Sequence, residues 1–113
     1  MTGYEFGEVL LVPFPFTDQS TSKCRPAAVV SSDAYHRERP GLMIRAVTSQ
    51  TRPQPAFGEA AATKWKQAGL LRLSVLEPVV ATIERGLVLR KLGRLADEDR
   101  AALRQVIGEI LGR

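Results

Sequence analysis

The sequence has little cysteine, little histidine and no long apolar run, and each shortage excludes a class of protein. Cys24 is the one cysteine among 113 residues, so no disulfide can form within the chain, which fits a reducing compartment. His36 is the only histidine, and no Cys or His pair has metal-ligand spacing. The apolar runs, such as residues 9–16, are far shorter than the roughly 18 residues that suggest a membrane-spanning helix. We therefore expect a cytoplasmic protein without a membrane segment or a bound metal.

Phosphate-binding loops and dinucleotide glycine fingerprints are also absent, and the N-terminus lacks the basic and apolar stretches of a secretory signal. The composition, with 44% hydrophobic and 25% charged residues, is that of an ordinary globular protein. A chain of 113 residues is long enough for one core and too short for two. The sequence predicts a single domain over residues 1–113 that uses no cofactor.

The formal net charge of +4 is concentrated in one stretch of the chain. Residues 19–58 hold six basic and two acidic residues, while the rest of the chain holds ten of each. The six are Lys23, Arg25, Arg37, Arg39, Arg45 and Arg52. A basic face binds a polyanion because phosphate neutralisation releases counterions. The stretch is therefore either a nucleic-acid-binding face or an ordinary solvated surface.

The hydrophobic pattern predicts five or six short strands and one terminal helix. Four expected strands cover residues 7–16, 25–32, 42–49 and 74–83, and the last of them is interrupted at Pro78. A short strand is also expected before a helical turn at residues 64–68, and a further short strand within residues 86–95. Apolar residues then recur at three- and four-residue steps and predict an amphipathic helix capped by Asp97. They are Leu103, Val106, Ile107, Ile110 and Leu111. We expect a mainly β fold (α+β), a small, strongly curved barrel with a C-terminal helix.

Two strand ends carry the residues best suited to phosphate chemistry. Arg25 and Pro26 begin one predicted strand, and Thr48, Ser49 and Gln50 end another, where a rigid barrel presents side chains into loops. The planar guanidinium matches a phosphate, and the hydroxyls can hold a phosphate oxygen. Together they could stabilise a phosphorane-like transition state without a metal. The alternative is a surface arginine and a Thr-Ser pair that only turns the chain.

Two further residues allow both a functional and an ordinary interpretation. His36 is either a catalytic base or a solvated loop histidine in the polar connection at residues 33–41. Trp65, between Lys64 and Lys66, either stacks on a nucleic-acid base or packs against the barrel. The sequence favours the ordinary interpretation for both.

Several linked motifs resemble those of the MazF/PemK toxins of bacterial toxin-antitoxin systems. They are GEVLLVPFPFTD, KCRPAAVVSS, AVTSQ, KWKQAGLLRLSVLEP and LVLRKLGRLADED, in order and at family-like spacing over almost the whole chain. The resemblance implies an SH3-like barrel of the CcdB/PemK type, a homodimer, and a metal- and ribosome-independent endoribonuclease that cuts single-stranded mRNA within short sequences. Attack by the ribose 2′-hydroxyl would leave a 2′,3′-cyclic phosphate and a 5′-hydroxyl. A cognate antitoxin protein would occupy the RNA groove.

The resemblance also implies roles for individual residues. Arg25 and Thr48 match the catalytic arginine and threonine of the family. The expected substrate-binding residues are Thr17, Lys23, Pro26, Ser49, Gln50 and Arg52. Glu77 departs from the pattern, because family members often carry a basic residue near that position, and an acid there would weaken RNA contact locally or mark a different dimer surface. The alternatives are a non-catalytic SH3-like module that binds RNA or protein, and a CcdB-like toxin that poisons gyrase.

Overall fold

The computed structural model describes residues 3–14, 23–50 and 52–112. Within them the chain forms six strands, two α-helices and a short 3-10 helix. In order, these are β1 (Glu8–Phe14), β2 (Lys23–Val29), α1 (Asp33–Glu38), β3 (Gly41–Ser49), β4 (Ala60–Ala62), β5 (Ser74–Glu84), η1 (Arg85–Leu87), β6 (Arg90–Arg94) and α2 (Asp97–Ile110). Neither of the described α-helices is long and apolar enough to cross a membrane.

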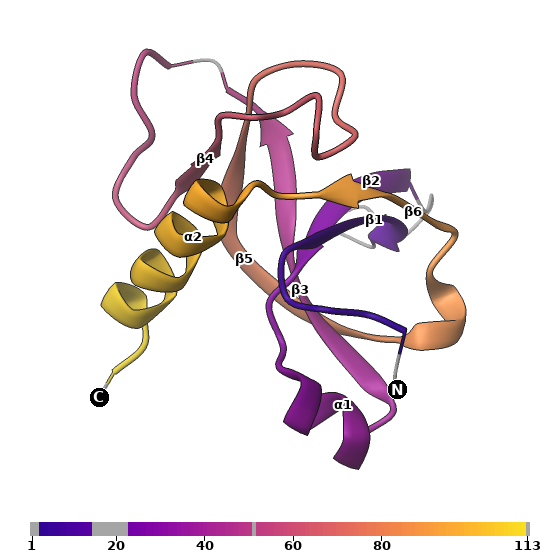
Figure 1. Ribbon diagram of the computed structural model, residues 1–113. Coiled ribbons are helices and arrows are strands. Elements are labelled where there is room, and N and C mark those ends of the chain that lie inside the picture. The colour runs from indigo at the N-terminus through magenta and orange to yellow at the C-terminus, as the bar shows by residue number, and fades with distance from the viewer. Residues whose placement is uncertain (1–2, 15–22, 51, 113) are drawn as a thin grey trace.

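The strands form one curled antiparallel sheet in the order β4-β5-β3-β2-β1-β6, with α2 beside β4 at one edge (Figure 1). Successive strand residues point to opposite faces, so neighbours such as Val9 and Leu10 enter different cores. Val9 belongs to the cluster that packs against α2 through Leu103, and Leu10 belongs to a cluster with Ile44 on the other face. The predicted fold class, a mainly β (α+β) SH3-like barrel with a C-terminal helix, is confirmed.

β2 extends further toward the N-terminus than the sequence predicts. It begins at Lys23 and ends at Val29, so Pro26 is its fourth residue and not its first. Hydrogen-bonded pairing with β3 starts only at Ala27, so on that side the missing N–H of Pro26 breaks no ladder bond. The expected polar connection after β2 contains the helix α1, which Ser32 caps by accepting a hydrogen bond from the Tyr35 backbone N–H.

β5 runs through Pro78 without the predicted interruption because the sheet bulges there. β3 pairs Arg45 with Val80 and Val47 with Leu76, which leaves three β5 residues opposite one β3 residue. The Arg45 side chain is 1% exposed and donates hydrogen bonds to backbone carbonyls at this bulge and at Gly58. The prediction that Arg45 contributes to a basic surface is therefore wrong.

α2 begins where the sequence predicts, but Asp97 is not its cap. Ala96 holds the cap position without a side-chain hydrogen bond, and the Asp97 carboxylate pairs with Arg100 one turn later. Asp99 is buried instead and accepts hydrogen bonds from the Thr63 hydroxyl (2.7 Å) and the Lys64 backbone N–H (3.0 Å). This carboxylate joins the first turn of α2 to the segment that follows β4.

The predicted apolar stripe of α2 is buried only along its first three turns. Leu103 is fully buried, and Val106 and Ile107 pack against the same core. Ile110 and Leu111 are exposed because this end of the helix extends past the sheet. The segment after β4 forms the predicted helical turn, closed by a bond from Ala68 N to Lys64 O, and Trp65 packs against the core as expected.

His36 is buried in α1 and is not the solvated loop histidine that the sequence favours. Its exposed fraction is 2%, and its Nε2 lies 2.5 Å from the Ser31 hydroxyl. That hydroxyl already accepts a hydrogen bond from Met43 N, so it can donate its own proton to a neutral imidazole. Burial lowers the pKa of His36 below its ordinary value of 6.5, Arg85 adds to this lowering, and the Tyr4 backbone opposes it. The imidazole is therefore held neutral as a structural group.

Acidification is expected to destabilise the protein through His36. The unfolded chain binds a proton at the ordinary pKa and the folded chain only at a lower one, so stability falls as the pH drops from about 6.5 toward the folded pKa. Urea unfolding at pH 7.5 and pH 5.5 should show a larger loss for the wild type than for His36→Gln, which keeps a polar side chain facing Ser31. An equal loss in both proteins would contradict this assignment.

Candidate active site

Arg25 and Thr48 stand on neighbouring strands. The pairing of β2 with β3 begins at Ala27 and Ala46, and Arg25 and Thr48 each lie two residues beyond that pair. Both residues line one cavity of about 620 Å³. The structure thus brings together the two residues that the sequence predicts as catalytic, while their catalytic role stays a prediction.

This first cavity is cationic. Arg72 and Arg90 line it together with Arg25, and its described lining contains no acidic residue. Ser49 and Ser74 also line this cavity with Thr48, and the Ser74 hydroxyl donates to the Arg72 carbonyl (2.9 Å). Guanidinium forks bind phosphate oxygens with two parallel hydrogen bonds, so a lining of three arginines and hydroxyl residues has the chemistry that a phosphate site needs.

A tight turn before β5 shapes one side of the first cavity. Gly69 has a φ of +80°, and a Cβ there would lie 2.0 Å from the Leu92 carbonyl oxygen. Only glycine allows this close approach of the turn to β6. The turn then continues into Leu71 and Arg72, so the contact at Gly69 places the Arg72 backbone at the cavity rim.

The other predicted substrate-binding residues divide between two cavities. Pro26 and Ser49 line the first cavity. Gln50 and Arg52 line a second one of about 260 Å³, which Thr48 and Ser49 share. Lys23 begins β2, but its side chain lies outside the described part of the structure, as does Thr17 entirely.

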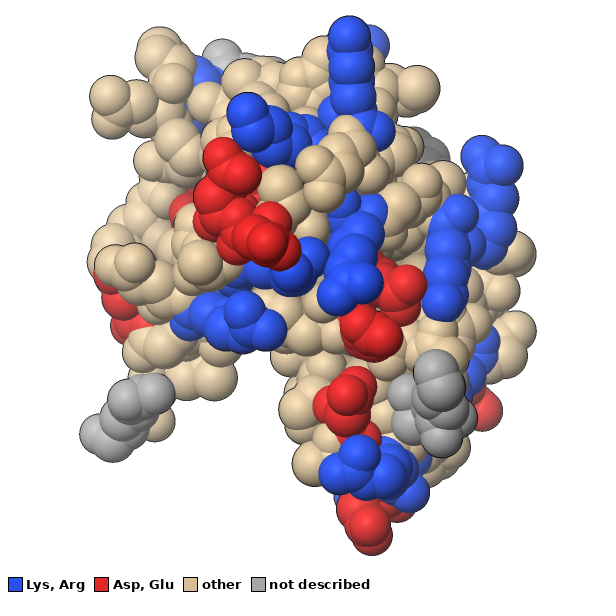
Figure 2. Space-filling view, viewed as in Figure 1, with Lys and Arg blue, Asp and Glu red and all other residues tan. Residues whose placement is uncertain are grey.

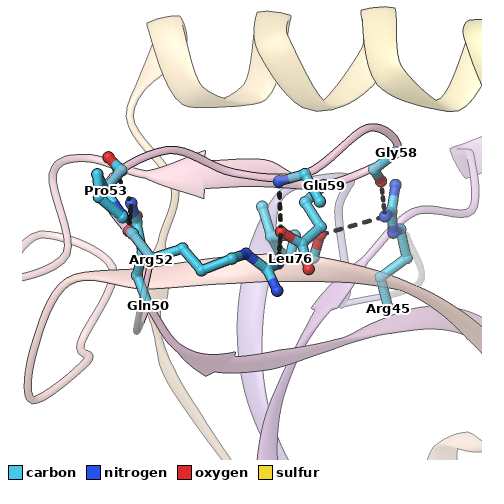
Figure 3. A network of polar contacts seen from close by, with 8 residues as sticks. Arg45, Gln50, Arg52, Pro53, Gly58, Glu59 and Leu76 are labelled. Carbon is cyan, nitrogen blue, oxygen red and sulfur yellow. Dashed lines mark hydrogen bonds and ion pairs between the residues drawn. The ribbon is translucent and has the colours of Figure 1, made fainter.

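A network of polar contacts forms the wall of the second cavity (Figure 3). Gln50 Nε2 donates to the carbonyls of Arg52 (2.8 Å) and Pro53 (3.3 Å). Arg52 Nη2 donates to Glu59 Oε1 (2.6 Å), which also accepts from Ala56 N (2.8 Å). The Arg52 guanidinium is the main cause of a lowered pKa at the Glu59 carboxyl, and the Ala56 N–H adds to it. Glu59 is therefore an anion fixed in place by the loop before β4.

The basic stretch of the sequence does not form one basic face. Arg45 is buried, and Arg37 and Arg39 are exposed on α1 and directly after it. Arg25 and Arg52 line separate cavities. Figure 2 shows basic and acidic side chains intermingled over the visible face. The described lining of the first cavity holds three arginines and no acidic residue.

Arg72, Arg90 and Glu59 also line the cavities, although the sequence does not predict them as site residues. Arg90 starts β6, and the rule that strand ends present functional side chains could have identified it. Arg72 and Glu59 lie in turns that have no recognisable pattern, and only the pairing of β5 with β3 and β4 brings them to the two cavities. No local signal in the sequence marks them.

A comparison with curated proteins finds no match. Comparisons with solved structures show the same fold in toxins of low sequence identity. The Mycobacterium tuberculosis toxin MazF-mt6 aligns with a TM-score of 0.71 at 18% identity, over 90% of this chain and 93% of the other. MazF in the MazE-MazF structure from Deinococcus radiodurans aligns with a TM-score of 0.69 at 23% identity, over 96% and 95% of the two chains. An endoribonuclease in complex with its cognate antitoxin from a mycobacterial species aligns with a TM-score of 0.69 at 16% identity, over 96% of this chain and 98% of the other.

A family model covers residues 5–111, nearly the entire chain. It includes β1, Arg25 of β2, Thr48 of β3 and the terminal helix α2. The family is described as the PemK-like, MazF-like toxin of type II toxin-antitoxin systems. Together with the curled sheet and its C-terminal helix, this match shows that the chain belongs to the PemK/MazF family of type II toxin-antitoxin toxins.

Proposed function

We propose that this toxin is a metal- and ribosome-independent endoribonuclease that cuts single-stranded mRNA at the first cavity. The observation that carries the proposal is the meeting of Arg25 and Thr48 in a cavity with two more arginines and no acidic residue in its described lining. Such a cavity matches the charge of a phosphodiester that gains a further negative charge in its transition state.

Arg25 is proposed to hold the scissile phosphate. Its guanidinium stays protonated and can form two hydrogen bonds to non-bridging oxygens, so charge stabilisation is its natural role. Thr48 is proposed to donate its hydroxyl to one of the same oxygens. Because both residues stand on paired strands rather than on free loops, the two groups are held in a fixed relation before the substrate arrives.

The proposed step is an attack by the 2′-oxygen of the RNA on its own neighbouring phosphorus. The bond to the 5′-oxygen breaks, and the proton lost from the 2′-hydroxyl is balanced by one gained at the leaving 5′-oxygen. The products are a 2′,3′-cyclic phosphate and a 5′-hydroxyl. The substrate must be single-stranded, because the 2′-hydroxyl aligns with its phosphate only when the backbone is free of A-form geometry.

Neighbouring nucleotides are proposed to contact the other residues of the two cavities. Arg72 and Arg90 would bind phosphates that flank the cut, since both line the first cavity beside Arg25. Pro26, Ser49, Gln50 and Arg52 keep the substrate-binding roles expected for them, and Thr17 and Lys23 are proposed to join them.

A cognate antitoxin is proposed to cover the same cavity. Leu71 lines the first cavity and is 91% exposed, so an apolar side chain stands beside three arginines. That combination suits a partner segment with acidic and hydrophobic residues. A homodimer is proposed as well, and the exposed apolar side chains of Val79, Val80 and Leu89 give it surface to bury.

Incubation of the purified protein with long single-stranded RNA tests this function. Cleavage should proceed equally with and without EDTA, and the fragments should carry 2′,3′-cyclic phosphate and 5′-hydroxyl ends. Intact RNA, or cleavage that stops on chelation, would contradict the proposal. Double-stranded RNA of the same sequence is the matched control and should stay intact.

A further inference from the structure

The second cavity adjoins the proposed cleavage site. It shares Thr48 and Ser49 with the first cavity, so the two cavities meet at these residues. A nucleotide whose phosphate lies against Thr48 in the first cavity can therefore place its base, or that of the adjoining nucleotide, in the second. We propose that the second cavity binds a guanine base next to the cut phosphate, an inference that rests on the proposed ribonuclease function.

The second cavity differs from the first in the sign of its charge. Glu59 and Glu77 both line it, beside Gln50 and Arg52. Glu59 is already engaged by Arg52, whereas no described residue forms an ion pair or hydrogen bond with the Glu77 carboxylate, which is only partly exposed. A carboxylate here would repel a phosphate, but it can accept hydrogen bonds from the edge of a base.

The β5 bulge determines the position of Glu77. The residue stands in the stretch of β5 that has no β3 partner, and its carbonyl accepts a hydrogen bond of 2.7 Å from the Nε of buried Arg45. Bulges commonly redirect side chains next to functional sites. The backbone that carries the Glu77 carboxylate is thus fixed by a buried arginine, which makes the residue suited to recognition in a defined geometry.

Guanine is the base whose hydrogen-bonding edge matches this lining. Its Watson–Crick edge presents two adjacent donors, N1–H and the N2 amino group, which a carboxylate can accept together. Adenine and cytosine each place a ring acceptor beside the amino group, and uracil presents a single N–H between two carbonyls. The O6 acceptor of guanine lies next to N1–H on the same edge and can accept a hydrogen bond from Arg52. The Arg52 guanidinium has five N–H donors, and its hydrogen bond to Glu59 uses Nη2.

Mapping the cut sites in long single-stranded RNA of mixed sequence gives the first test. Guanine should be enriched at one position adjoining the cut. An RNA oligonucleotide containing a mapped site is then compared with the same oligonucleotide carrying inosine at that position, which removes only the N2 amino group. The wild type should cleave the inosine substrate about 10-fold more slowly, because one good bidentate base contact contributes about 1–3 kcal/mol of discrimination.

Glu77→Gln should reduce the difference between guanosine and inosine to less than about threefold. Glu84→Gln, on the same strand but outside both cavities, should keep the wild-type difference, and equal thermal unfolding of the three proteins confirms that they fold alike. Cleavage without guanine enrichment, or a Glu77→Gln protein that still discriminates, would overturn the guanine assignment and leave the ribonuclease function intact. Failure to cut any RNA would overturn both.

Discussion

Replacing Arg25 with alanine is expected to slow RNA cleavage by about 10²- to 10³-fold, the usual cost of losing one transition-state donor. The guanidinium is proposed to bind the phosphate oxygens on which negative charge develops. In the alanine variant only Thr48, Arg72 and Arg90 remain to stabilise that charge. Single-turnover cleavage of an oligonucleotide with a mapped site measures the effect. Because Arg25 belongs to neither apolar core, the variant should keep the wild-type fold, which its circular dichroism spectrum checks.

Two controls make the Arg25 experiment specific. Arg25→Lys keeps the charge but loses the planar fork, so it should recover only part of the rate. Arg37→Ala removes an exposed arginine of α1, outside both cavities, and should cleave at the wild-type rate. An Arg25→Ala protein that cleaves within threefold of the wild type would exclude Arg25 from the proposed site.

Of all the proposed substitutions, Arg45→Met is expected to destabilise the protein most, by about 2–5 kcal/mol in the free energy of unfolding. The guanidinium is buried and donates to the carbonyls of Glu77 (2.7 Å), Gly58 (2.6 Å) and Leu76 (3.2 Å), contacts partly visible in Figure 3. Methionine fills similar space but leaves these carbonyls without the arginine donors. Burial lowers the pKa of Arg45, yet the group stays protonated at neutral pH.

Chemical denaturation of wild type and variant measures this loss. The matched control is Arg94→Met, because Arg94 forms an exposed ion pair with Glu5 whose side chains are 52% and 53% exposed. Such a pair contributes about 0–1 kcal/mol, so its removal should change stability little. If both variants lost the same free energy of unfolding, the hydrogen bonds from Arg45 to the carbonyls would not be the source of its contribution to stability.

The sequence predicts the fold class well because its signals are local and consistent. Branched and aromatic runs gave the strands, and the three- and four-residue recurrence around Leu103 gave α2 with its boundaries nearly correct. Asp97 and Pro78 differ from their predicted roles because of tertiary contacts. Asp99 accepts a hydrogen bond from Thr63 while Ala96 holds the cap position. Pro78 lies in the bulge beside Arg45, where β5 continues without a β3 partner and a missing N–H breaks no bond to β3.

The candidate site was only partly predictable from the sequence. The sequence predicts that Arg25 and Thr48 lie near strand ends, and both residues line the first cavity. Arg72 reaches that cavity only through the pairing of β5 with other strands, which no short pattern encodes, whereas Arg90 begins β6, where the strand-end rule applies. Charge counting grouped Arg45 with the surface arginines, because a count cannot distinguish a buried guanidinium from an exposed one.

The most direct test of the central claim replaces a single ribose at a mapped cut site. An RNA oligonucleotide with one 2′-deoxy residue immediately 5′ of the scissile phosphate lacks the proposed nucleophile and keeps every phosphate and base. The toxin should bind this oligonucleotide as tightly as the all-RNA substrate and should not cut it at that site. Cleavage of the 2′-deoxy bond at the normal rate would contradict the proposal that the first cavity promotes attack by the 2′-hydroxyl.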